Sequence, residues 1–321
     1  MLSIKHVLLC LCMCLVGTLH AAPLDSTANS LLWKLTAPNG AVSHIYATMH
    51  LRDSTILRQR DTVLELVKKA RVLYAELDLD SMMDAMSSID PKIMMLPAGQ
   101  TIKGLYTPEE LIVIRTALKD RLGEMAMMVE FMRPPAIIAM LMMEMTETTA
   151  PYGVDEFLWL IAKQGNVARR GIESPNEQLK ALLKMPNEAL VEIARSINDK
   201  DTMTSALIKA YANERLPDII ALSASLSKWP EFERSVNGDR NTIMVERLSK
   251  DLVRGDVFIA VGALHLPGHQ GMLRGFESRG FVVEPILGGV RSSWMPPPTP
   301  PTPPTPPTPP TPRTDTPQPR H

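Results

Sequence analysis

The stretch VSHIYATMHLRDSTILRQRDTVLELVKKARVLYAELD, residues 42–78, decides the fold. Its first part, Val42–Met49, predicts a strand that ends at His50. The segment Asp61–Ala70 has apolar residues at helical spacing, and the short apolar run after it predicts a second strand that ends in acid at Glu76. A strand, a helix and a strand within about thirty residues form a β-α-β unit, so we expect the two strands to be parallel.

The pattern of strands and helices continues on both sides of this unit. The further strands that we expect are Leu31–Leu35, Val167–Ile172, Asp256–Val261 and Phe281–Ile286, and the further helices are Val154–Lys163, Gly271–Ser278 and most of Asn176–Lys250. The region Met82–Thr149 is helical in pattern and rich in methionine. It either packs as ordinary core, which we favour, or forms an adaptable apolar wall over a site. The sequence thus predicts an α/β fold with a central, mainly parallel sheet, flanking helices and a helical, Met-rich insertion.

The two ends of the chain differ from this central part. Residues 1–21 have a basic start, an apolar run and small residues near Ala21, which is typical of a secretory signal peptide; an uncleaved anchor is the alternative. All three cysteines fall within it, so the expected mature chain has no disulfide and no thiolate ligand. Residues 291–321 are rich in proline and threonine, which predicts a disordered, extended tail. One folded domain over residues 22–290 remains, in a periplasmic or secreted protein.

The charge pattern excludes several classes of partner. Lys and Arg number 34 against 35 Asp and Glu, and no basic run indicates nucleic-acid binding. After cleavage of the signal, no further stretch is long and apolar enough to predict a membrane span. The Pro-rich tail is either a solvated extension, which we favour, or a docking segment for a partner in the cell envelope.

Four polar residues occupy the same place in four predicted units. His50, Glu76, Glu173 and His265 each lie at or just past the carboxyl end of a predicted strand. Ligands of open parallel sheets bind outside those strand ends. We therefore expect these residues, more than 200 positions apart in the sequence, to meet at one rim of the sheet.

Two imidazoles with one or two carboxylates suit a divalent ion such as manganese, cobalt, zinc or iron(II). Such an ion would lower the pKa of water and polarise a carbonyl group. Without a metal, a histidine could act as general base on water and a glutamate as its orienter or acid. His44 and His269 are weaker candidates, because His44 lies inside a strand and a Pro-Gly pair separates His269 from His265.

Each candidate also has a purely structural interpretation. His50 could be a hydrogen-bonding loop residue, Glu76 an ion-pair partner, and Glu173 a charge at the start of the next helix. His265 has the most unusual setting, because Gly262 and the Pro-Gly turn after it allow close backbone approach. That setting is more typical of a site than of a core.

At these residues the sequence resembles the TraB/PrgY/GumN family, which includes the Tiki proteases. The similarity runs from Leu32 to about Pro285, and the joint order and spacing of its motifs make it specific. The matching segments are Leu32-Trp33-Lys34, Ala47-Thr48-Met49-His50, Glu76-Leu77-Asp78, Tyr152-Gly153-Val154-Asp155, Gly171-Ile172-Glu173-Ser174, Glu177-Gln178-Leu179, Arg240-Asn241 and Gly262-Ala263-Leu264-His265.

The resemblance implies a fold similar to the erythromycin esterase and ChaN-like proteins, and an activity of metal-dependent peptide hydrolysis by analogy with Tiki. It implies that the two G-x-x-H histidines, His50 and His265, form the site with Glu76. It also implies that Arg240 stabilises the charge of an oxyanion, with Asn241 beside it. The structural alternative for this pair is a surface helix start, where Asn241 would act as a cap.

One position departs from the family pattern. Ala47 stands where the first motif of the family has glycine. Alanine would be strained there if the position needed a positive φ or a close approach to a metal, and it costs little if the residue simply lies in a strand, as the alternation indicates. We favour the second interpretation; a binding-only member of the family is the alternative.

We therefore expect an exported hydrolase that cleaves peptide (amide) or ester bonds of a peptide or small-molecule substrate. A divalent manganese, cobalt or zinc ion at His50, Glu76 and His265 would activate water, with Glu173 as a further carboxylate. The alternative is a non-catalytic envelope binding protein. ChaN-like relatives suggest haem or iron capture for it, and the GumN branch suggests an association with polysaccharide. A structural envelope protein is a third class.

Overall fold

A computed structural model describes residues 29–123, 129–143, 149–196, 200–224 and 228–289. The expected signal peptide at 1–21, its three cysteines and the Pro-rich tail at 291–321 lie outside these ranges. No helix in the described part is both long and apolar enough to cross a membrane.

The described part of the chain contains one six-stranded sheet with the order β4-β3-β5-β2-β1-β6. The strands are β1 (Leu32–Thr36), β2 (Val42–Thr48), β3 (Val72–Ala75), β4 (Ala168–Gly171), β5 (Val257–Gly262) and β6 (Val282–Pro285). Strands β2, β5, β3 and β4 pair in parallel, whereas β1 pairs antiparallel with both β2 and β6. The predicted α/β fold with a mainly parallel central sheet is confirmed.

Strand β5 is the centre of this sheet. All six of its residues are buried, and it pairs with β2 on one side and β3 on the other. The two strands of the predicted β-α-β unit are therefore parallel but not adjacent, because a strand from much later in the chain inserts between them. Continuous apolar strands of this kind are typical of parallel sheets covered on both faces.

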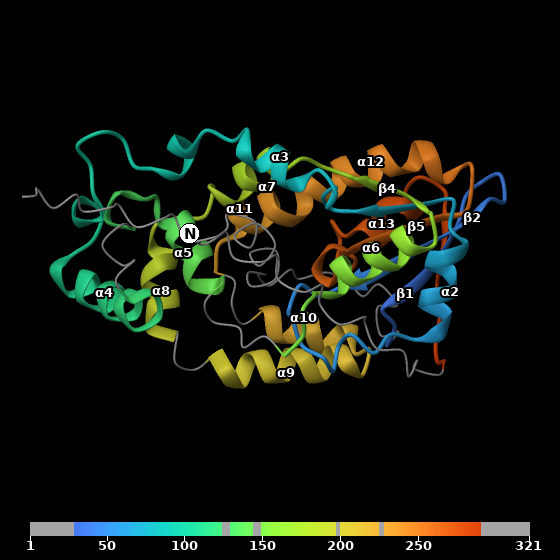
Figure 1. Cartoon of the computed structure of the whole chain (residues 1–321), viewed down its shortest axis with the longest axis horizontal. Helices are drawn as coiled ribbons and strands as arrows, with labels where there is room; N and C mark the ends of the chain where they lie inside the picture. Colours follow the sequence, from blue (N-terminus) through green and yellow to red (C-terminus); the bar gives the residue numbers. More distant parts are fainter. Residues whose placement is uncertain (1–28, 124–128, 144–148, 197–199, 225–227, 290–321) are drawn as a thin grey trace, which may run out of the picture.

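Helices surround the sheet at one end of the molecule (Figure 1). Those around the strands are α2 (Asp61–Lys69), α6 (Val154–Gln164), α12 (Arg240–Leu252) and α13 (Met272–Glu277). Helix α2 packs against α6, and α12 packs against α13. Further helices are α3 (Met82–Ser87), α7 (Pro175–Leu182), α9 (Lys200–Ala212), α10 (Leu216–Ala224) and α11 (Pro230–Glu233). A π-helical turn η5 (Arg234–Asp239) leads into α12, and a 3₁₀ turn η6 (Ala263–His265) follows β5.

A helical lobe forms the opposite end of the molecule (Figure 1). It contains α4 (Pro108–Leu122), α5 (Pro134–Met143) and α8 (Glu188–Ser196), which pack on one another around their own apolar cluster. Ile137, Ile138 and Leu141 of α5 are fully buried in that cluster. The described part of helix α5 therefore packs as ordinary core, in line with the favoured interpretation, while most methionine side chains of the insertion lie outside the described ones.

Ala47, the departure from the family pattern, lies inside β2. It pairs with Val261 of β5, and its N–H donates to the carbonyl oxygen of Leu31 at 2.8 Å. Ala47 is not among the non-glycine residues with positive φ. Alanine therefore fits this position without backbone strain, and the strained alternative is wrong.

Candidate functional site

Three of the predicted residues meet at the carboxyl ends of the parallel strands. His50 follows β2, Glu76 follows β3 directly, and His265 lies in the turn η6 after β5. The Nε2 atoms of the two histidines lie 3.9 Å (His50) and 3.6 Å (His265) from the same oxygen, Glu76 Oε1. The parallel pairing of β2, β5 and β3 brings these strand ends to one edge, where such sheets place their ligands.

This cluster lies at the predicted rim of the sheet, but its side chains are buried. His50 and Glu76 are each 5% exposed and His265 only 1%. The start of α6 closes directly over the end of β2, where the N–H of Val154 donates to Met49 O. A Cβ added at Gly153 would lie 2.9 Å from His50 O, so only glycine allows this approach.

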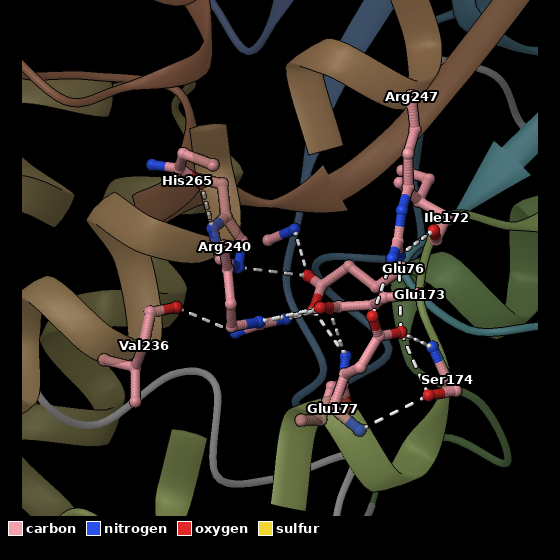
Figure 2. A network of polar contacts seen from close by, with 12 residues as sticks. Glu76, Ile172, Glu173, Ser174, Glu177, Val236, Arg240, Arg247 and His265 are labelled. Carbon is pink, nitrogen blue, oxygen red and sulfur yellow. Dashed lines mark hydrogen bonds and ion pairs between the residues drawn. The ribbon is translucent and has the colours of Figure 1, made fainter. Parts of the chain in front are cut away.

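Arg240 and Glu173 join the cluster from a second side (Figure 2). The Arg240 guanidinium donates to Glu76 Oε2 at 2.8 Å and to both carboxylate oxygens of Glu173. The amide of Gln178 also donates to both acids, at 3.0 Å to Glu76 Oε2 and at 2.9 Å to Glu173 Oε1. Glu173 is thus linked to the histidines only indirectly, because it shares the donors Arg240 and Gln178 with Glu76.

The environment of Glu76 keeps its carboxylate ionised. Burial on its own raises the pKa of Glu76. The charge and hydrogen bond of His265 in its protonated form, with the charges of Arg240 and of protonated His50, outweigh it and hold the pKa well below its ordinary value. Its two oxygens have different roles. Oε2 accepts from Arg240 and Gln178, whereas Oε1 accepts from the N–H of Gly262 at 2.8 Å and faces the histidines.

These three side chains form a donor set that suits a divalent metal ion. Two imidazole nitrogens and one carboxylate oxygen are ligands of manganese, cobalt and zinc. A Cβ at Gly262 would lie 3.1 Å from Glu76 Oε1, 3.7 Å from His265 Cδ2 and 3.9 Å from His50 Nε2, so the glycine keeps open a hollow between them.

The spacing of the cluster is slightly wider than that of an assembled metal site. Ligand atoms of a tetrahedral ion with bonds of ~2.1 Å lie about 3.4 Å apart. Within the described ranges, no three His, Cys, Asp or Glu side chains already stand at ligand spacing. An ion between His50, Glu76 and His265 would need a contraction of about 0.2–0.5 Å in the nitrogen–oxygen distances.

The structure adds two partners to which the sequence had assigned no such role. Asp155 Oδ1, in the first turn of α6, lies 2.9 Å from His50 Nδ1. Asn241 Oδ1, at the start of α12, lies 2.6 Å from His265 Nδ1. Both residues fall in the motifs Tyr152–Asp155 and Arg240-Asn241, so the signal was present, but sequence separations of 105 and 24 residues concealed the contacts.

Within the described ranges, the other two histidines are not members of this hydrogen-bond network. His44 is six positions before His50, inside β2, where it pairs with Lys34 of β1. His269 is exposed in the turn before α13. Neither is placed to take the role of His50 or His265.

The comparison with known families agrees with these motifs. The model of the TraB/PrgY/gumN family matches residues 31–285. The chain belongs to this family. That match spans the whole six-stranded sheet and every residue of the cluster, from β1 to β6. No functionally curated protein matches the chain.

Proposed function

We propose that this TraB/PrgY/gumN family protein is an exported, metal-dependent hydrolase of peptide (amide) or ester bonds. The observation that carries the proposal is the convergence of two imidazole nitrogens on one ionised carboxylate oxygen, with a glycine keeping the space between them open. This donor set is suited to ions that activate water at neutral pH.

In this proposal His50, Glu76 and His265 hold a manganese, cobalt or zinc ion. When bound, such an ion supplies Lewis-acid polarisation of a carbonyl and a lowered pKa for water. The protein contributes the position and charge of the ligands, and their burial excludes bulk water and strengthens electrostatic interactions.

Arg240 has two roles in this proposal. Its guanidinium pairs with both Glu76 and Glu173, and by occupying Glu76 Oε2 it leaves Oε1 facing the histidines. The family resemblance also implies that its positive charge stabilises an oxyanion. Only the Glu76 carboxylate separates it from the two histidines, and this position is consistent with that role.

The test is metal analysis combined with hydrolysis of a peptide and ester library, on the wild type, His265→Ala and the control His269→Ala. We expect about one ion per wild-type chain and loss of most metal and turnover in His265→Ala, because a tight site with three ligands cannot spare one. His269→Ala should resemble the wild type. Full metal occupancy and turnover in His265→Ala would contradict the proposal.

The same experiment separates the rival mechanisms. His50→Ala, Glu76→Ala and the double variants should lose little more than His265→Ala alone, since residues that act as a unit are not additive. Turnover that survives complete chelation would favour general acid–base catalysis by the histidines without a metal. Metal binding without hydrolysis, or a Soret band on addition of haem, would favour a binding protein.

The export part of the proposal rests on residues 1–21. Their basic start, short apolar run and small residues favour cleavage near Ala21, which places the mature protein in the periplasm or the medium. We expect N-terminal sequencing of the exported protein to begin at Ala22 or Pro23. A chain that begins at Met1 would refute this part alone.

A further inference from the structure

We infer that Asp155 and Asn241 are positioning residues that fix His50 and His265 in one and the same tautomer. In that tautomer the hydrogen is on Nδ1, and the lone pair of each Nε2 atom is directed at Glu76 Oε1. The inference deepens the proposed function. The tautomers follow from hydrogen bonds alone, and only their role in binding a metal ion rests on the proposed function.

The tautomer of His50 follows from the chemistry of Asp155. An ionised carboxylate accepts hydrogen bonds and has no hydrogen to donate. The 2.9 Å contact of Asp155 Oδ1 with His50 Nδ1 therefore requires the hydrogen to be on Nδ1. In the neutral ring this leaves the lone pair on Nε2, the atom that lies 3.9 Å from Glu76 Oε1.

The tautomer of His265 follows from a second bond of Asn241. The Asn241 Nδ2 atom lies 2.9 Å from the carbonyl oxygen of Gln270, and a carbonyl can only accept, so the amide N–H₂ must point there. The amide oxygen then faces His265 Nδ1 at 2.6 Å and must accept from it. His265 Nε2 consequently presents its lone pair toward Glu76 Oε1.

The two partners differ because their surroundings differ. An aspartate at 241 would place its second oxygen against the Gln270 carbonyl, so that two acceptors would face each other. Asp155 lies in the first turn of α6, where the helix dipole favours a negative charge. One histidine therefore has an anionic orienter and the other a neutral one.

These tautomers explain why His50, Glu76 and His265 need a positive charge between them. With both rings neutral, two nitrogen lone pairs and an ionised carboxylate oxygen face one another. Attraction between them requires a proton on an imidazole, as in the ion pairs with Glu76, or a metal cation. In metal sites, a ligand histidine typically donates its other ring N–H to a carboxylate or carbonyl oxygen.

A direct test is ¹⁵N NMR of the metal-free full chain with labelled histidine, at a pH where the rings are neutral. The ring-nitrogen shifts report which nitrogen carries the hydrogen, and His50→Gln and His265→Gln assign the signals. We expect hydrogen on Nδ1 of both residues in the wild type. Asn241→Ala should abolish the preference at His265, and Asn241→Asp should keep it while lowering the melting temperature.

The second measurement is a titration of chelator-treated protein with Co²⁺. Asp155→Ala and Asn241→Ala should each lower the affinity for Co²⁺ about 10–100-fold, the usual effect of removing a partner of a ligand. The matched controls are Glu156→Gln and Thr242→Ala, which change the next residue on each helix. Glu156 pairs with Arg52 and Thr242 with Gly238 O, so both controls should retain the wild-type tautomers and affinity.

The outcomes distinguish this inference from the proposed function. Hydrogen on Nε2 of either histidine in the wild type would overturn the inference even if the protein binds metal and hydrolyses peptides. An Asn241→Ala variant with unchanged tautomer and Co²⁺ affinity would also overturn it. Failure of the wild type to bind any metal would refute the proposed function, while the NMR result would still decide the tautomers.

Discussion

Arg240 is the residue on which the buried charges of the cluster depend. Its side chain is only 7% exposed, and it is held between Glu76 and Glu173, whose side chains are 6% and 4% exposed. Two buried carboxylates so close together would repel each other strongly without a cation between them. The arginine is therefore as important for folding as for any chemistry.

We expect Arg240→Met to destabilise the protein by about 3–5 kcal/mol, because it leaves two buried acids without their cation. The matched control is Arg247→Met on the same helix, whose pair with Glu177 is 43% and 40% exposed. That change removes this exposed pair and one hydrogen bond to the carbonyl oxygen of Ile172, so it should cost only about 1–2 kcal/mol. Urea unfolding at neutral pH measures both, and equal losses in the two variants would contradict the account.

Among the elements, β4 determines where Glu173 lies. The N–H of Glu173, just past β4, donates to Glu76 O at 3.0 Å, so the two acids are joined through the backbone as well. This close approach depends on Gly171, the last residue of β4. A Cβ there would lie 2.4 Å from the backbone nitrogen of Asp78.

Gly171→Ala should therefore push the end of β4 away from the chain after β3. We expect a loss of about 1–3 kcal/mol, as for other overpacked sites, and a weaker Glu173–Arg240 contact. The control is Gly165→Ala at the end of α6, where a Cβ would make ordinary contacts of 3.5 Å or more. A melting temperature for Gly171→Ala as high as that of Gly165→Ala would refute this.

The ends of the strands could be predicted from the sequence, but the order of the strands in the sheet could not. Apolar runs that end in His50, Glu76 and His265 marked three of the strand ends, since local pattern governs where a strand stops, whereas the run before Glu173 contains two arginines. The position of β5 between β2 and β3 could not be predicted from the sequence, because strand order depends on pairing between distant segments.

The sequence also could not predict that the cluster is buried or which residues bind its histidines. They depend on how α6 and α12 pack over the sheet edge. In the sequence, Asp155 has the appearance of an ordinary acid in a first helical turn, and Asn241 that of a cap.

At the scale of the whole molecule, exposed acid–base pairs join elements that are distant in the sequence. Glu177 of α7 pairs with Arg247 of α12, and Asp80, after β3, pairs with Lys163 of α6 and Arg169 of β4. Each is weak alone because it is solvent-exposed, but together they make the stability of the fold depend on pH.

The direction of this dependence follows from the pKa values. Hydrogen bonds from Arg247 lower the pKa of Glu177 to about 2, and those from Arg169 and Lys163 lower that of Asp80 to about 2. In the unfolded chain both acids titrate near pH ~4. Their contribution to stability is thus fully present above pH ~4 and is lost as the pH falls toward 2.

We therefore expect the melting temperature to fall between pH ~4.5 and 2, and to fall less steeply in the double variant Glu177→Gln, Asp80→Asn. The variant should start lower at neutral pH, because it lacks the ion pairs, and approach the wild type at pH 2, where the native acids are themselves becoming protonated. Circular dichroism melts across this range provide the measurement. A constant difference in melting temperature from pH 7 to pH 2 would show that these pairs do not link the stability of the fold to pH.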